Sequence, residues 1–300
     1  ASGEPPVVRN TPGSTARWSS AKNACRRAAG VSLLASNRLT NCQRTYVRRS
    51  PVEFSPMNDR REGHIMPRYL LQASLVFTTL SAAVFAADPP CVKNAPDVGT
   101  KLPLVFCDDF QSGDSTNWVP GDPKAWKMTK LSDNFVFEQF QQSKVKNPVR
   151  SPFNRCLIKD VTVGDFVLDL KFQSTKKDYG HRDLCLFFGF QDPSHHYYVH
   201  FGKKTDDHAN QIFIVNEKPR TKISTKTTAG TNWDDEWHHA RIVREVKSGK
   251  IEIYFDDMKT PVMTATDKTF AWGQVGIGSF DDTGRFDDVY LFGHEVKKPE

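Results

Sequence analysis

The stretch HHYYVHF at 195–201 carries three side chains that can exchange protons, spaced two residues apart. Successive side chains of a strand point to opposite faces, so His196, Tyr198 and His200 share one face. In a polysaccharide lyase, a Tyr or His removes the proton beside a carboxylate that a cationic or amide side chain neutralises. The spacing therefore makes His200 and Tyr198 candidate catalytic residues. The alternative is an ordinary solvent-facing strand, because aromatic side chains favour strands.

Cationic side chains near this stretch extend the predicted site. Arg150 and Arg182 are candidates for binding a carboxylate or sulfate, because a guanidinium matches planar oxyanions in a bidentate fashion. His181 stands next to Arg182 in HRDLC at 181–185. Together with the three residues of 195–201, these side chains form a predicted glycan-binding face.

Acidic pairs occur near both ends of the predicted folded part, in FCDDF at 106–110 and in SFDDTGRFDD at 279–288. Hard cations such as Ca²⁺ take six to eight oxygen ligands from carboxylates and carbonyls. Asp109 and Asp288 therefore form a candidate structural calcium site, provided that the first and last strands are neighbours. The alternative is that these aspartates cap turns by accepting hydrogen bonds from their own backbone.

A series of strand-like segments must position these side chains. The clearest is GDFVLDLKF at 164–172, where apolar and polar residues alternate with the period of two that a half-buried strand requires. Similar runs occur at 104–110, 134–140, 185–190, 196–201, 211–216, 239–245, 250–255, 274–280 and 287–293. Helical periodicity is weak throughout, so we predict an all-β fold, a two-sheet antiparallel sandwich, over 104–295 with a lead-in at 88–103.

Three segments resemble the concanavalin A-like lectin/glucanase superfamily, in its laminin-G-like and bacterial secreted branches. They are FCDDFQSGDSTNW, WHHARIVREVKSGKIEIYFDDMKTPVMTA and GQVGIGSFDDTGRFDDVYLFG, and the resemblance covers about 105–293. It implies a jelly roll whose concave face holds a glycan in many relatives. It also implies a buried Trp237, which leaves Trp233 as the surface indole that would stack on a sugar.

The resemblance does not extend to the catalytic motif of the superfamily's retaining glucanases. Those enzymes resemble one another in an E-x-D-x-x-E strand, which sets two glutamates on one face as acid and nucleophile. This chain contains no such strand. Its candidate functions are therefore a glycan-binding protein, a glycoside hydrolase or polysaccharide lyase of another type, or an envelope module for protein–protein contact.

The sequence of 66–90, MPRYLLQASLVFTTLSAAVFAADPP, has the layout of a secretory signal. A basic start precedes an apolar core and a small-residue cleavage site, so 66–87 is a predicted signal peptide, with a retained anchor as the alternative. Residues 1–65 are then either a disordered basic segment or lie ahead of the true start at Met66. We expect a secreted, periplasmic or cell-surface protein with no stable membrane span after cleavage.

Charge and cysteines agree with export. Residues 1–87 hold 12 Lys and Arg against 4 Asp and Glu, whereas 88–300 hold 29 against 31. The excess of basic residues therefore lies outside the predicted fold, so we expect the protein to bind no nucleic acid. We also expect it to be a monomer. Four cysteines follow the predicted signal: Cys91, Cys107, Cys156 and Cys185. In an oxidising compartment they predict two disulfides of unknown pairing, with buried free thiols as the alternative.

Overall fold

The alternating run at 164–172 forms most of strand β6 (Val163–Ser174) in the computed structural model, which describes residues 90–298. Phe166, Leu168 and Leu170 are buried in the main core. Asp169 and Lys171 alternate with them and point to the opposite face of the strand. The pattern that predicted a half-buried strand is confirmed here.

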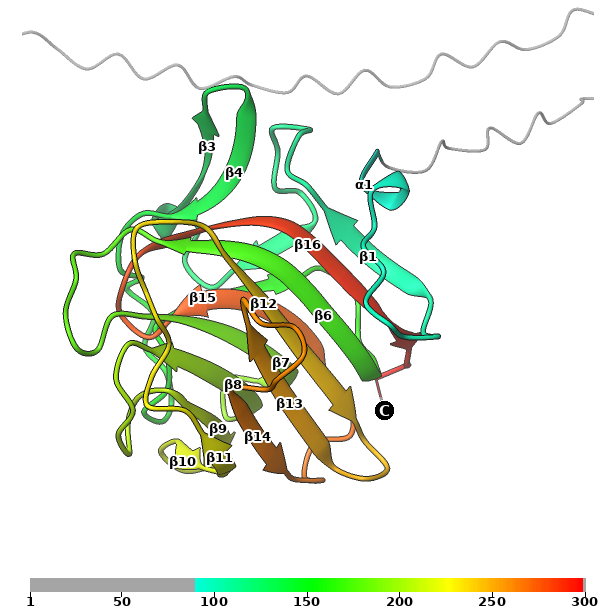
Figure 1. Ribbon diagram of the computed structural model, residues 1–300, viewed down its shortest axis with the longest axis vertical. Helices are drawn as coiled ribbons and strands as arrows, with labels where there is room; N and C mark the ends of the chain where they lie inside the picture. Colours follow the sequence, from blue (N-terminus) through cyan, green and yellow to red (C-terminus); the bar gives the residue numbers. More distant parts are fainter. Residues whose placement is uncertain (1–89, 299–300) are drawn as a thin grey trace, which may run out of the picture. The chain divides into compact units, whose positions relative to one another are not determined.

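Two antiparallel sheets pack face to face, and Figure 1 shows the sheet of β6, β12 and β13 in front of the sheet of β7 and β8. In order across the first sheet lie β11 (Ser224–Thr227), β14 (Met263–Thr266), β13 (Lys250–Phe255), β12 (His238–Glu245), β6, β16 (Gly284–Glu295), β4 (Asn134–Gln139) and β3 (Trp126–Leu131). Its ninth strand, β1 (Leu104–Asp108), pairs with β16.

The second sheet has seven strands. In order they are β10 (Thr221–Lys222), β9 (Gln211–Asn216), β8 (His195–Gly202), β7 (Asp183–Asp192), β15 (Gln274–Ser279), β5 (Asn154–Ile158) and β2 (Trp118–Pro120). The helical elements within 90–298 are short: α1 (Pro90–Lys93) and the 3₁₀ turn η1 (Pro123–Ala125). The predicted all-β sandwich is confirmed, and its strands run from Leu104 to Glu295.

The main core lies between the two sheets and takes one face of every long strand. From β8 it takes Tyr197, Val199 and Phe201, and from β12 it takes Ala240 and Ile242. Inner faces of both sheets must be apolar in a sandwich, because side chains from both fill the space between them. The remaining faces of β8 and β12 therefore point away from the core, and these outer faces carry the candidate sites.

The lead-in segment packs against the outer face of the nine-stranded sheet. Figure 1 shows α1 beside β1, and a disulfide joins Cys91 of α1 to Cys107 of β1. Cys91 belongs to a small apolar cluster with Val167, Tyr290 and Phe292. One end of this outer face is thereby covered.

The expectation of two disulfides is wrong. Cys156 and Cys185 are buried free thiols. They lie on β5 and β7, which β15 separates, and Cys156 belongs to the core between the sheets whereas Cys185 belongs to a cluster on the outer face. Their side chains point in opposite directions, so a bond of normal geometry cannot join them.

The predicted signal peptide at 66–87 and the segment 1–65 lie outside the described residues. Among residues 90–298, helices of sufficient length and apolarity to cross a membrane are absent.

Candidate functional site

The side chains of β8 alternate as the sequence predicted. His196, Tyr198 and His200 share the outer face of the seven-stranded sheet. Neighbouring strands add an aromatic layer around them. We call this surface the covered face, and its apolar members are Leu157, Cys185, Phe187, Phe190, Tyr198, Phe213, Val215 and Phe280.

Side chains from loops close over this face. Val149 and Phe153 pack against the cluster. The guanidinium of Arg220 lies 4.1 Å from the ring centre of Phe280, and its Nη1 donates to the hydroxyl of Tyr198 at 3.0 Å. As a result Tyr198 is fully buried and His200 is only 4% exposed. A sugar ring cannot reach these side chains in this conformation.

Burial also sets the protonation of this face. It lowers the pKa of His196 and of His200 to about 3, so both imidazoles are neutral at ordinary pH. Burial raises the pKa of Tyr198 well above its usual range, so its hydroxyl keeps its proton. The protonated hydroxyl of Tyr198 accepts from Arg220, so a role as general base would require the loops to move first.

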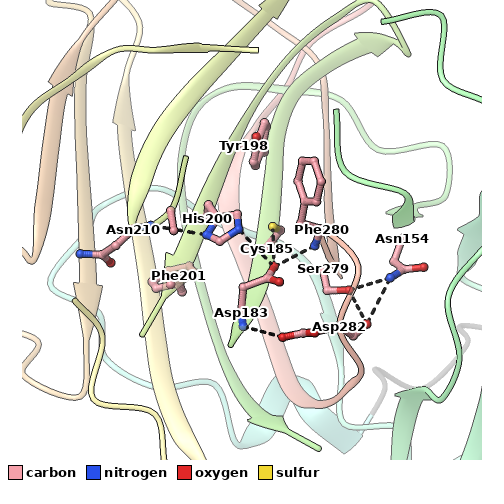
Figure 2. A network of polar contacts seen from close by, with 12 residues as sticks. Asn154, Asp183, Cys185, Tyr198, His200, Phe201, Asn210, Ser279, Phe280 and Asp282 are labelled. Atoms are coloured by element: carbon pink, nitrogen blue, oxygen red, sulfur yellow. Dashed lines mark hydrogen bonds and ion pairs between the residues drawn. The ribbon is translucent and has the colours of Figure 1, made fainter. Parts of the chain in front are cut away.

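His200 is held between two groups of the chain itself (Figure 2). Its Nδ1 accepts from the backbone N–H of Asn210 at 3.4 Å, and its Nε2 lies 3.7 Å from Oδ2 of Asp183. Both ring nitrogens thus already face protein groups.

Two other predicted glycan-binding residues are structural in this conformation. Arg182 is 1% exposed, and its Nη2 donates to Asp235 at 2.8 Å. Trp233 was expected at the surface, and that expectation is wrong. Its indole is 2% exposed and packs edge-on to Phe172 and Phe255, and its Nε1 donates to the carbonyl of Phe201. The core takes this indole because the loop before β12 folds back against the end of β8, where a backbone carbonyl satisfies the indole N–H.

Two predicted residues are exposed, Arg150 and His181. The guanidinium of Arg150 lies 5.7 Å from the ring centre of Phe280, at the margin of the covered face. Nε2 of His181 lies 2.8 Å from Asp206. Of the seven predicted glycan-binding residues, these two are the ones that a ligand can reach without a loop movement.

The predicted calcium pair lies where the first and last strands meet. β1 pairs with β16, with Asp108 opposite Val289, which brings Asp109 and Asp288 to the same end of the pair. Oδ2 of Asp288 lies 2.8 Å from Nζ of Lys171, and Oδ1 of Asp109 accepts from the backbone of Gln111. Both carboxylates thus already have partners in the chain.

The outer face of the nine-stranded sheet carries an open groove that the sequence reasoning did not identify. Its volume is about 350 Å³. We call it the open groove, and it is lined by Asn134, Lys171, Trp237, His238, His239, Asp256 and Asp287. A second hollow of about 180 Å³ shares Lys171 and His239 with it and reaches the lead-in at Asn94 and Pro96.

Strand register brings these residues together. On β6 and β12, Lys171 lies opposite His239, and Lys171 also lies opposite Asp287 of β16. The register of β16 shifts directly after Asp287, and Asp288 has a left-handed backbone with φ 48°. Such a bulge re-aims the side chains around it, and aspartate tolerates this conformation better than most residues.

Hydrogen bonds hold the groove residues in place. Oδ1 of Asp169 lies 2.8 Å from Nε2 of His239, and Nδ2 of Asn134 donates to Asp287 at 2.7 Å. Burial raises the pKa of Asp287 to about 6, an effect that the Asn134 hydrogen bond partly offsets. The hydrogen bond to Asp288 raises the pKa of Lys171, which keeps its charge. The groove therefore offers a cation, an amide, an imidazole and a carboxyl group whose pKa lies close to neutral pH.

Trp237 supplies the apolar part of the groove. The resemblance implied that it is buried, but it is half-buried and lines the groove. The signal available in the sequence was the polar alternation of β6 and β12, where Asp169, Lys171 and His239 mark the face that points away from the core. That signal shows which face is polar, but not that a tryptophan borders it.

Comparison with known proteins yields distant structural similarities. No protein-family model matches the chain, and no curated protein matches it. The carbohydrate-binding module CBM66 from Bacillus subtilis is 18% identical, covers 60% of this chain and 98% of its own, and has a TM-score of 0.44. Winged bean acidic lectin complexed with methyl-α-D-galactose is 13% identical over 61% and 95%, with a TM-score of 0.42. The GH43 protein BlXynB from Bacillus licheniformis is 9% identical over 63% and 39%, with a TM-score of 0.44. At these values, function has to be argued from the chain's own side chains.

Proposed function

We propose that this protein is an exported glycan-binding β-sandwich and that it binds its glycan in the open groove. The observation that carries the proposal is the half-buried indole of Trp237 beside Lys171, His239 and Asn134 in a cavity of about 350 Å³. An indole face stacks on the apolar face of a sugar ring. Amide, imidazole and ammonium groups around it pair with sugar hydroxyls, which both donate and accept hydrogen bonds.

Two sequence features support the same proposal. The predicted signal peptide at 66–87 sends the chain out of the cytoplasm, where polysaccharides are abundant ligands. The resemblance to concanavalin A-like lectins, in their laminin-G-like and bacterial secreted branches, adds an expectation of glycan binding for the fold class. Specificity then depends on the groove residues, because one fold hosts many functions.

The test is a binding assay with neutral, carboxylated and sulfated polysaccharides by affinity electrophoresis, followed by calorimetry with oligosaccharides of the polymer that binds. We expect Trp237→Ala to weaken binding at least about tenfold, because buried aromatic anchors dominate binding sites. Trp272→Ala is the matched control, since Trp272 is also half-buried but lies outside the open groove. Failure of every polymer to bind, or equal affinity of Trp237→Ala and wild type, would refute the proposal.

A second candidate function is glycoside hydrolysis in the same groove. The observation that favours it is Asp287, whose pKa of about 6 suits a general acid near neutral pH. Asp256 is a second carboxylate lining the groove. Hydrolysis would appear as shortening of the bound polymer in size-exclusion chromatography, abolished by Asp287→Asn and retained by Tyr198→Phe. A polymer that binds but never shortens would leave the protein a binder only.

A further inference from the structure

Three carboxyl groups meet where β7 begins beside the loop that joins β15 to β16. Asp183, Asp281 and Asp282 each offer one oxygen, and these oxygens lie within 4.8 Å of one another. Asp183 and Asp282 are both 1% exposed, whereas Asp281 is exposed. Figure 2 shows the carboxyl group of Asp282 beside the backbone nitrogen of Asp183, whose N–H donates to Oδ2 of Asp282 at 3.0 Å. This cluster belongs neither to the open groove nor to the Asp109–Asp288 pair.

The hydrogen bonds of the cluster leave one buried oxygen without a partner. Oδ2 of Asp183 accepts from the backbone N–H of Phe280 at 2.8 Å and from Sγ of Cys185 at 3.4 Å. Oδ1 of Asp183 is buried and has no hydrogen-bond partner within 90–298. A buried carboxylate oxygen without a partner is costly, so this atom indicates that the site is incomplete as a purely protein structure.

The positive charges around the cluster do not balance the negative charge of its three carboxylates. Nζ of Lys176 lies 3.2 Å from Asp282, and Lys176 is the one cation within 4 Å of these three carboxylates among the described residues. The hydroxyl of Tyr179 donates to Asp282 at 2.9 Å but carries no positive charge. Nε2 of His200 lies 3.7 Å from Oδ2 of Asp183, which is too far for a hydrogen bond. Three clustered carboxyl groups with one ammonium group beside them lack a compensating charge, which a bound cation would supply.

We propose that Asp183, Asp281 and Asp282 bind a hard divalent cation of the Ca²⁺ type. Three carboxylates supply up to six oxygens of the kind that Ca²⁺ prefers, and the exposed Asp281 gives the ion a path from solvent. Bound there, the ion ties the loop after β15 to the start of β7. That loop includes Phe280, which packs on the covered face, so the ion would stabilise the cover over Tyr198 and His200.

A softer metal ion, Zn²⁺, is the alternative ligand for side chains beside this cluster. Asp183, Cys185 and His200 also bring one ligand atom each within 4.8 Å of one another, a set that suits Zn²⁺. All three residues are at most 4% exposed, so an ion has no path to them from solvent, whereas the oxygen cluster includes the exposed Asp281. The oxygen cluster is therefore the better site.

The experiment uses the full chain freed of metal by chelation. Tb³⁺ luminescence sensitised through Tyr179, competition by Ca²⁺, and the rise in Tm with added Ca²⁺ measure binding. We expect saturable Tb³⁺ binding that Ca²⁺ displaces, and a loss of affinity of at least about tenfold in Asp281→Asn, because ligand charge tunes calcium affinity. Asp281→Asn is the primary variant because its exposed side chain can change without disturbing the fold, and Asp183→Asn is the second variant.

Asp288→Asn is the matched control, since it removes the acid of the other candidate calcium site and should leave Ca²⁺ affinity unchanged. The proposal is overturned by absence of Ca²⁺ and Tb³⁺ binding up to about 10 mM, which is weaker than extracellular calcium sites. It is equally overturned if Asp281→Asn and Asp183→Asn bind like wild type, or if Asp288→Asn abolishes binding. Binding of Zn²⁺ alone, lost in Cys185→Ser, would assign the site to the softer metal and also overturn it.

Discussion

The two outer faces of this sandwich follow the same alternation of side chains but differ in what lies over them. The covered face carries imidazoles and aromatic rings beneath Val149, Phe153 and Arg220. The open groove carries Lys171 and His239 in a hollow that solvent can enter. A polar strand face is therefore not by itself a binding surface, because the loops decide whether a ligand can reach it.

The largest difference between the faces should appear in stability. Phe187 is fully buried in the covered face. We expect Phe187→Ala to lower the free energy of unfolding by about 3–5 kcal/mol, because it removes a packed ring and leaves a cavity. Lys171→Ala in the open groove should change it by less than about 0.5 kcal/mol. Urea unfolding monitored by tryptophan fluorescence measures both, and equal losses would erase the distinction between the faces.

The partial cover of the nine-stranded sheet can be tested through its disulfide. Cys91 and Cys107 lie 16 positions apart in the sequence. Replacing both by Ser should lower the free energy of unfolding by about 3 kcal/mol, because the unfolded chain regains the entropy of that loop. Reduction of the wild type should reproduce the loss, while Cys156 and Cys185 stay unreactive towards a thiol reagent until the chain unfolds. A disulfide that can be removed at no cost would mean that the lead-in adds nothing to the fold.

The faces should also respond to pH with opposite signs. The unfolded chain protonates His196 near pH 6.5 and the folded chain near pH 3, so stability is full above about pH 6.5 and falls as the pH drops. Asp287 acts in reverse: its folded pKa of about 6 exceeds the unfolded value of 3.8, so it adds stability as the pH falls from about 6 to 4.

We therefore expect His196→Gln to make the loss of stability between pH 6 and pH 4 shallower by about 1.4 kcal/mol per pH unit. Asp287→Asn should make the same loss steeper, by at most a similar slope. Denaturant titrations at half-unit intervals of pH give both slopes. Identical slopes in the two variants would mean that both groups are solvated alike, contrary to their burial.

The smallest expected effect concerns ligand contacts in the open groove. Lys171→Met should weaken glycan binding by about 1 kcal/mol, the usual value of one hydrogen bond, without changing the Tm. Lys226→Met on β11 is the control for the loss of a surface charge, since Lys226 is exposed and lies outside the groove. Calorimetry with the same oligosaccharide measures both, and a larger effect at Lys226 would move the binding site away from the groove.

Sequence reasoning predicted ten of the sixteen strands within residues 90–298. Each of the ten predicted runs coincides with an observed strand, and in β6 the reason is the alternation of apolar and polar residues that is typical of a half-buried strand. The strands β2, β3, β5, β10, β11 and β14 were not predicted. β5 shows why. All five of its residues, NRCLI, are buried, including the polar Asn154 and Arg155, so its sequence lacks the apolar–polar alternation by which a half-buried strand is recognised.

The sequence predicted correctly which side chains share a strand face, but not which of them are exposed to solvent. The sequence alone determined that the fold is all-β and that His196, Tyr198 and His200 share one face, since both follow from local periodicity. Only the tertiary structure decided that this face is covered, that Trp233 enters the core and that Trp237 borders a groove. Exposure depends on loops and strands far apart in the chain, such as Arg220 over Tyr198 and Asp287 opposite Lys171. No local pattern encodes contacts between segments that folding alone brings together.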